Sequence, residues 1–202
     1  MTAGRLPLTA GLAAVATVWA AGCSVGTSEP FTRQTFSFSF ESGFDWAADG
    51  TDLDDPPVIW TVEASQELAE RGIGSVNLAI ENLNDAGKIW MEHAFLLRPG
   101  ATYDVEVAFD FASADFGDIN LWTIIAGVSP DDPETSEDLT FQDDTGNGAA
   151  SDVGFLWTGK SYSFTETAGE DGLLYVALGV WGTSEFSRAY FIDDVELVFT
   201  RR

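Results

Sequence analysis

Two adjacent carboxylates interrupt an apolar stretch near the end of the chain. Large apolar side chains alternate there with the two-residue period of a half-buried strand, which we predict over residues 188–199. On this spacing Asp193 shares the apolar face and Asp194 lies on the opposite one. Carboxylates in such a strand are costly unless a cation or hydrogen-bond donors compensate them. The apolar face consists of Phe191, Val195, Leu197 and Phe199.

Flat aromatic rings are a second group of residues suited to binding. Sugar-binding sites stack pyranose faces on such rings and read the hydroxyl groups with neighbouring polar side chains. Four of the seven tryptophans have neighbours that place them toward a surface or rim: Trp90, Trp122, Trp157 and Trp181. We predict that Trp90, Trp122 and Trp157 contact a ligand. The alternative is that most of the rings pack in the core or at sheet edges.

Little in the sequence points to catalysis. With 33 Asp and Glu residues, carboxylate pairs arise by chance, so they do not argue for a glycosidase. His93 is the only histidine, and we expect it to pack on the apolar face of its strand. One histidine and one cysteine exclude a zinc site built from these residues, and Gly72-Ile73-Gly74 matches no phosphate-binding loop. We predict no enzyme, with an uncharacterised hydrolase as the weakest alternative.

Short strands separated by turn residues must position these side chains. Alternation and turn signals predict about nine or ten strands and no long helix, a pattern typical of an all-β, antiparallel two-sheet sandwich. Residues 66–71 have the composition of a single helical turn, and the long acidic segment 129–152 is expected to be functional or mobile. The predicted strands cover residues 36–40, 58–63, 76–80, 89–97, 103–111, 119–128, 155–157, 162–164, 174–180 and 188–199.

Residues 1–22 have the features of a secretion signal. Arg5 is the only charge before an apolar run that is short and rich in alanine, which favours a signal peptide over a membrane span. The ending Ala20-Ala21-Gly22-Cys23 resembles a lipobox, the bacterial and archaeal signal for acylating a cysteine after cleavage. This resemblance implies a lipid on Cys23. The alternative is an ordinary signal that leaves Cys23 as a free thiol.

The chain as a whole is strongly acidic. Nine Lys and Arg residues face 33 Asp and Glu residues, which gives a formal net charge of −24. This charge opposes binding to phosphate backbones and to anionic lipid heads, so we predict no nucleic-acid partner. Abundant acids with few lysines resemble the proteins of salt-loving, halophilic archaea or bacteria, where salt screens self-repulsion. Residues 23–34 are small and polar, and we expect them to tether a domain over residues 35–200.

Three short motifs open, divide and close this predicted domain. They are Phe40-Glu41-Ser42-Gly43 followed by Trp46, Arg98-Pro99-Gly100-Ala101-Thr102-Tyr103-Asp104-Val105, and Tyr190-Phe191-Ile192-Asp193-Asp194-Val195. Together they resemble the galactose-binding-like jelly roll of carbohydrate-binding modules. The resemblance implies a jelly-roll sandwich whose first and last strands lie side by side.

The same resemblance implies a structural calcium ion, which members of that family often hold between the first and last strands. Calcium takes several oxygen ligands from carboxylates and carbonyl groups. The ligands implied here are Glu41 and one of Asp193 and Asp194. The alternative is that these carboxylates cap turns or face water.

The sequence therefore predicts a non-catalytic binding protein outside the cytoplasm, at a cell surface or in a periplasm. Its expected partners are the membrane, through lipidated Cys23, and a glycan or another surface ligand. The alternative is a structural or accessory lipoprotein that uses the same sandwich for protein contacts and has no sugar site.

Overall fold

The part of the chain that the structure describes contains eleven strands, most of them with alternating apolar and polar side chains. The structure is a computed structural model, and it describes residues 32–114, 122–146, 154–182 and 187–202. Residues 31–202 belong to one compact unit. The predicted signal peptide, Cys23 and most of the predicted tether lie outside the described residues. No helix among the described residues is long and apolar enough to cross a membrane.

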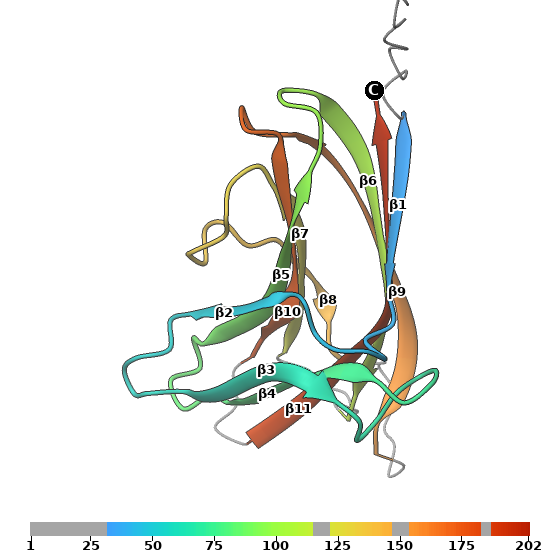
Figure 1. Ribbon diagram of the computed structural model, residues 1–202. Coiled ribbons are helices and arrows are strands. Elements are labelled where there is room, and N and C mark those ends of the chain that lie inside the picture. Colours follow the sequence, from blue (N-terminus) through green and yellow to red (C-terminus); the bar gives the residue numbers. More distant parts are fainter. Residues whose placement is uncertain (1–31, 115–121, 147–153, 183–186) are drawn as a thin grey trace, which may run out of the picture. The chain divides into compact units, whose positions relative to one another are not determined.

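The first sheet contains six strands, and each is antiparallel to its neighbours. They are β1 (Arg33–Phe38), β3 (Ile59–Ser65), β4 (Ser75–Glu81), β6 (Thr102–Ser113), β9 (Leu156–Thr167) and β11 (Ser187–Arg201). The order is β3-β4-β11-β6-β9, and β1 also pairs with β11. Figure 1 shows β1 beside the C-terminal half of β11, so the predicted pairing of the first and last strands is confirmed.

The second sheet contains five antiparallel strands in the order β2-β5-β10-β7-β8. Its long central strands are almost free of polar side chains on the face that meets the first sheet. The strands are β2 (Ala47–Thr51), β5 (Lys88–Leu96), β10 (Leu173–Trp181), β7 (Thr123–Ser129) and β8 (Phe141–Asp144).

The inner faces of the two sheets share one apolar core. Aromatic rings cross between them: Phe95 of β5 lies 4.9 Å from Phe36 of β1 and 5.1 Å from Phe199 of β11, measured between ring centroids. Each large apolar side chain that is fully buried stabilises the fold by roughly 1.5–3 kcal/mol. The predicted all-β, two-sheet jelly-roll sandwich is therefore confirmed, and this core is what holds its layers together.

Several element boundaries differ from the predictions. The sequence predicts neither β2 nor β8, because these short edge strands are rich in Asp and lack a long apolar alternation; their pairing with β5 and β7 makes them strands. β9 runs without a break through Gly159, where two strands were expected. Residues 66–71 form bends in a loop and no helical turn.

The face predicted for the last strand is right for Val195, Leu197 and Phe199 but wrong for Phe191 and Asp193, because β11 contains a bulge. β11 pairs with β6 at Asp193–Asp110 and next at Glu196–Ala108, so β11 has one residue more than β6 between these pairs. Asp194 within the bulge has φ of 47°. The extra residue shifts the two-residue period. Phe191 and Asp193 consequently lie on the outer face of the sheet, whereas Leu197 belongs to the core.

Part of the acidic segment after β7 covers the outer face of the second sheet. Leu139 packs there in a small apolar cluster with Trp90 and Ile125. The hydroxyl group of Ser136 donates to Asp52 Oδ2 at 2.5 Å, beyond the edge of β2. Residues 130–140 are thus fastened across the sheet, and residues 147–152 of the predicted segment lie outside the described residues.

Candidate functional site

The candidate site lies where two strands share one edge of β11. β4 pairs with residues 187–192 and β1 pairs with residues 195–200, so both pairings stop at the bulge. The chain that leaves β1 and the loop of residues 66–74 that enters β4 meet in this gap. The outer face of the sheet is therefore interrupted here, and polar side chains from three chain segments converge.

Asp193 fastens the loop of residues 66–74 to the bulge. Its Oδ2 accepts hydrogen bonds from the backbone N–H groups of Glu70 at 3.0 Å and Arg71 at 3.2 Å, and its Oδ1 accepts one from Asp194 N at 2.7 Å. The residue is fully buried. Burial raises the pKa of this carboxyl group, and the backbone N–H donors oppose the rise. These donors compensate the free-energy cost that we expect for a carboxylate buried in an apolar strand.

Glu41 binds the part of the same loop that leads into β4. Its Oε1 accepts hydrogen bonds from Ile73 N at 3.0 Å and Gly74 N at 3.3 Å. Gly72 has φ of +68°, and a β-carbon on it would lie 1.9 Å from Glu41 Oε1. A side chain at residue 72 would therefore displace the Glu41 carboxylate, and the positive φ also favours glycine there.

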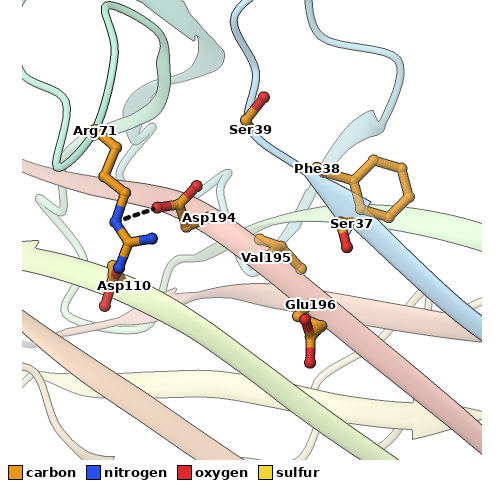
Figure 2. A pocket seen from close by; sticks show the side chains of 8 residues that line it. All are labelled: Ser37, Phe38, Ser39, Arg71, Asp110, Asp194, Val195 and Glu196. Carbon is orange, nitrogen blue, oxygen red and sulfur yellow. Dashed lines mark ion pairs between the residues drawn. The ribbon is translucent and has the colours of Figure 1, made fainter.

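A hollow of about 360 Å³ opens beside this loop, and we call it the bulge pocket. Arg71 forms one wall, with its Nε 3.2 Å from Asp194 Oδ2. Figure 2 shows Arg71 reaching toward Asp194, with Asp110 on the neighbouring strand and Glu196 further along β11. The volume of the bulge pocket falls within the usual range for small-ligand sites. The full lining is Ser37, Phe38, Ser39, Arg71, Asp110, Asp194, Val195 and Glu196.

A second hollow, of about 430 Å³, adjoins the bulge pocket and shares Ser37, Phe38 and Ser39 with it. The remaining lining comes from the chain that leaves β1, namely Phe40, Ser42, Gly43, Phe44 and Asp45. Serine hydroxyl groups thus line the boundary between the two hollows. Together the hollows follow the end of β1 and provide both donors and acceptors of hydrogen bonds.

Trp157 lies on the same outer face, one step along from the bulge pocket. β9 places Gly159 opposite Asp110 and Trp157 opposite Ala112. Residues two apart on one face of a strand are separated by roughly 7 Å. The half-buried ring of Trp157 therefore lies next to small side chains and near the acidic rim of the pocket. That Trp157 contacts a ligand stays a prediction.

The other two predicted tryptophans do not reach a surface, so this part of the prediction is wrong. Trp90 is fully buried. It does oppose Ile89 and Met91, as predicted, but residues 130–140 cover the face on which it lies. Trp122 belongs to the main core, with its ring centroid 5.6 Å from that of Tyr190.

The carboxylates predicted to bind calcium do not fit that ion as they lie. The oxygens of Glu41 and Asp193 face backbone N–H donors, and Asp194 faces the guanidinium group of Arg71. Calcium needs six to eight oxygen ligands around one point. Among the described residues, no group of three or more His, Cys, Asp or Glu side chains is placed to hold a metal ion. Glu41 and Asp193 instead accept hydrogen bonds from the loop, and Asp194 forms an ion pair with Arg71.

A third hollow, of about 350 Å³, lies on the outer face of the second sheet. It contains Glu92 of β5 in hydrogen-bond contact with Asp132 of the covering segment. Burial raises the pKa of Glu92 to about 7; the indole N–H of Trp90 opposes the rise, and Asp132 and Asp49 add to it. Two carboxyl groups in mutual contact are closer than the roughly 5–9 Å that glycoside hydrolysis requires. The pair therefore does not favour the hydrolase alternative.

Comparisons with known proteins agree with this fold. The sequence matches no protein-family model and no curated protein. The structure is similar to the K3 cleaved adhesin domain of Lys-gingipain from Porphyromonas gingivalis, with a TM-score of 0.52, 15% identity, and coverage of 82% of this chain and 98% of that one. This likeness shows the fold alone.

Two carbohydrate-binding structures have lower TM-scores. The chain is similar to TmCBM61 in complex with β-1,4-galactotriose, with a TM-score of 0.45, 17% identity, and coverage of 81% of this chain and 94% of that one. It is also similar to the CBM22-1 xylan-binding domain of Paenibacillus barcinonensis, with a TM-score of 0.38, 17% identity, and coverage of 83% and 94%. These two likenesses assign no ligand to this chain.

Sequence reasoning missed most of the polar residues that line the bulge pocket. Asp110 and Glu196 occupy outward positions of alternating strands, where acidic residues are ordinary in this chain. Arg71 had a usable signal, because it is one of only nine basic residues and it precedes two closely spaced glycines. Its position beside Asp194 depends on the bulge, which the period of the strand did not predict.

Proposed function

We propose that this protein is a non-catalytic module that binds a neutral glycan along the bulge pocket and the adjoining face around Trp157. The observation that carries this proposal is the combination of one guanidinium group, three carboxylates and serine hydroxyls in one pocket. Sugar hydroxyls both donate and accept hydrogen bonds, so a site of mixed donors and acceptors suits them. Trp157 would supply the ring on which a pyranose stacks.

The charge of the pocket favours a ligand without acidic groups. Arg71 contributes one positive charge, while Asp110, Asp194 and Glu196 each carry a carboxyl group. An anionic polysaccharide would face this excess of carboxylates and the net charge of −24 on the whole chain. A neutral sugar instead presents hydroxyl donors to the carboxylates at no such cost.

A lipid on Cys23 would hold the module at the outer surface of a membrane. This part of the proposal rests on the sequence of the predicted signal and on the polar tether that follows it. Replacing Cys23 with Ser should release the protein from the membrane fraction into the medium or periplasm. Retention of the Cys23→Ser protein in that fraction would contradict the anchor and leave the glycan site unaffected.

The glycan site is tested by affinity electrophoresis or pull-down with the full chain. Galactan and xylan belong among the neutral polysaccharides to be tested, because the two carbohydrate-binding structures are described with such ligands; polygalacturonate serves as the anionic comparison. We expect Trp157→Ala and Asp110→Asn to weaken binding by about tenfold or more. Trp181→Ala is the matched control, since Trp181 is also half-buried but lies on the second sheet. The proposed site would be contradicted if Trp181→Ala lost as much affinity as the site variants, or if the wild type bound polygalacturonate more tightly than the neutral polysaccharides.

A further inference from the structure

The loop of residues 66–74 is held by two carboxylates, at residues 70–71 and at residues 73–74, and it carries the only guanidinium group in the lining of the bulge pocket. We propose that Glu41 and Asp193 are positioning residues of the glycan site, which capture backbone N–H groups of this loop and so present Arg71 to the ligand. This inference rests on the proposed function. It assigns Arg71 as the donor that determines which sugar hydroxyls are recognised.

The first observation is the number of N–H groups held within one short loop. Asp193 accepts from residues 70 and 71, on either side of the peptide bond that leads into Arg71. Glu41 accepts from residues 73 and 74. Hydrogen bonds to a charged acceptor are about twice as strong as those between neutral groups. Four of the five successive residues 70–74 are thus fixed through their backbone.

The second observation is that the loop is shaped for this capture. Gly72 leaves room for the Glu41 carboxylate, and a β-carbon on Gly74 would lie 2.5 Å from the carbonyl oxygen of Phe40. Ser75 completes the contacts by donating its hydroxyl to Leu68 O at 2.5 Å. The two glycines let the loop lie against the chain that leaves β1.

The third observation concerns the side chain that the loop presents. Arg71 is 78% exposed at its side chain, whereas its partner Asp194 is 27% exposed. The contact with Asp194 uses Nε, which leaves the two Nη groups for hydrogen bonds to a ligand. An exposed arginine loses entropy when a ligand orders it. Fixing the backbone of Arg71 in advance, with the Asp194 carboxylate beside its Nε, reduces that cost.

The test combines hydrogen exchange with glycan binding in the full-length protein. In the wild type, we expect slow exchange at the amides of residues 70, 71, 73 and 74. Glu41→Ala should speed exchange at residues 73 and 74, lower the affinity for the bound neutral polysaccharide about fivefold to tenfold, and leave the far-UV spectrum unchanged. Arg71→Ala should lower the affinity at least as much, with the amides of residues 73 and 74 still protected. Glu106→Ala, an exposed carboxylate on the same sheet, is the control and should change neither quantity.

A second variant approaches the same contact from the loop. Gly72→Ala should displace the Glu41 carboxylate and give the same pattern as Glu41→Ala, while the double variant should lose little more than either single one, because both break one contact. Unchanged affinity in Glu41→Ala, despite fast exchange at residues 73 and 74, would overturn the positioning role while the proposed function stands. A wild type that binds none of the glycans overturns the proposed function, and this inference falls with it.

Discussion

Glu92 Oε2 lies 2.7 Å from Trp90 Nε1, so a buried carboxyl group accepts a hydrogen bond from a buried indole. Both residues belong to β5, and Glu92 is only 8% exposed. Asp132 of the covering segment contacts the same carboxyl group, and Asp49 lies close enough to raise its pKa further. The indole N–H stabilises the ionised form, but burial and the two aspartates oppose it more strongly.

This arrangement makes the stability of the protein depend on pH near neutrality. The pKa of Glu92 rises from an ordinary value of 4.5 to about 7 in the folded state. Between these two values the folded protein binds more protons than the unfolded chain, so the free energy of unfolding falls as the pH rises through this window. We expect Glu92 to contribute a loss of up to about 3 kcal/mol between pH 4.5 and pH 8. This loss is measured as the difference between the free energies of unfolding at pH 5 and pH 8, obtained from urea unfolding monitored by circular dichroism.

Glu92→Gln separates this effect from the titration of other groups. The amide keeps an acceptor for the Trp90 indole but does not ionise, so the variant should lose less stability than the wild type between pH 5 and pH 8. Glu106→Gln, at an exposed position, should behave as the wild type does. A wild type and a Glu92→Gln variant with parallel pH profiles would show that Glu92 ionises at its ordinary pKa.

Asp52 should stabilise the protein by forming an ion pair with the buried ammonium group of Lys88. Lys88 Nζ lies 2.6 Å from Asp52 Oδ2, and the Lys88 side chain is 8% exposed. The hydrogen bonds from Lys88 and Ser136 lower the pKa of Asp52, so its contribution is present above pH 3.8 and is lost as the pH falls below that value. We expect Asp52→Ala to cost about 1–3 kcal/mol at pH 7, because Lys88 loses its counter-charge.

A double-mutant cycle checks this prediction. Lys88→Met removes the buried charge, so adding Asp52→Ala to it should cost much less than Asp52→Ala alone. Additive costs would mean that the two side chains do not interact in solution. Because Ser136 also donates to Asp52, faster hydrogen exchange within residues 130–140 is a second expected result of Asp52→Ala.

The sequence predicted the layers of this fold better than the edges and the site. Runs such as residues 103–111 alternate over a long stretch, so both the strand and its buried face could be read from period two alone. β2 and β8 carry few apolar side chains and exist because β5 and β7 offer free edges, which only the assembled sheet shows. The central strands thus follow from local pattern, and the edge strands follow from pairing.

The bulge explains why the site was harder to predict than the fold. One extra residue at Asp194 reverses the faces of the residues on either side, so counting along β11 put Phe191 in the core and Leu197 on the same face as Asp193. The rings of Trp90 and Trp122 were misplaced for a different reason. Period two correctly set Trp90 opposite Ile89, but it could not show that residues 130–140 return to cover that face. Contacts between distant parts of the chain decided both cases.

Gly182 should be intolerant of a side chain because the Trp122 ring fills the space beside it. A β-carbon on Gly182 would lie 1.6 Å from Trp122 Cε3, which is far inside van der Waals contact. Trp122 is 4% exposed and packs in the main core, so it has little room to move. We expect Gly182→Ala to lower the free energy of unfolding by about 1–3 kcal/mol. Gly159→Ala is the control, because its β-carbon would meet only Asp110 Oδ1 at 3.5 Å; similar stability of both variants would contradict the placement of Trp122.

Calcium should leave the stability of the protein unchanged, although the family resemblance implies a calcium site. The oxygens of Glu41 and Asp193 already accept hydrogen bonds from backbone N–H groups, whose positive ends oppose a cation on the same side. Arg71 adds a positive charge beside Asp194, which opposes a second cation there. We expect the melting temperature at low salt to be the same in millimolar calcium and in excess chelator.

The same titration on Glu41→Gln and Asp193→Asn gives this prediction its control. If these carboxylates bind only backbone N–H donors, both variants should melt at lower temperatures than the wild type. The decrease should be the same with and without calcium. A calcium-dependent rise in the wild type that disappears in both variants would restore the metal site implied by the resemblance.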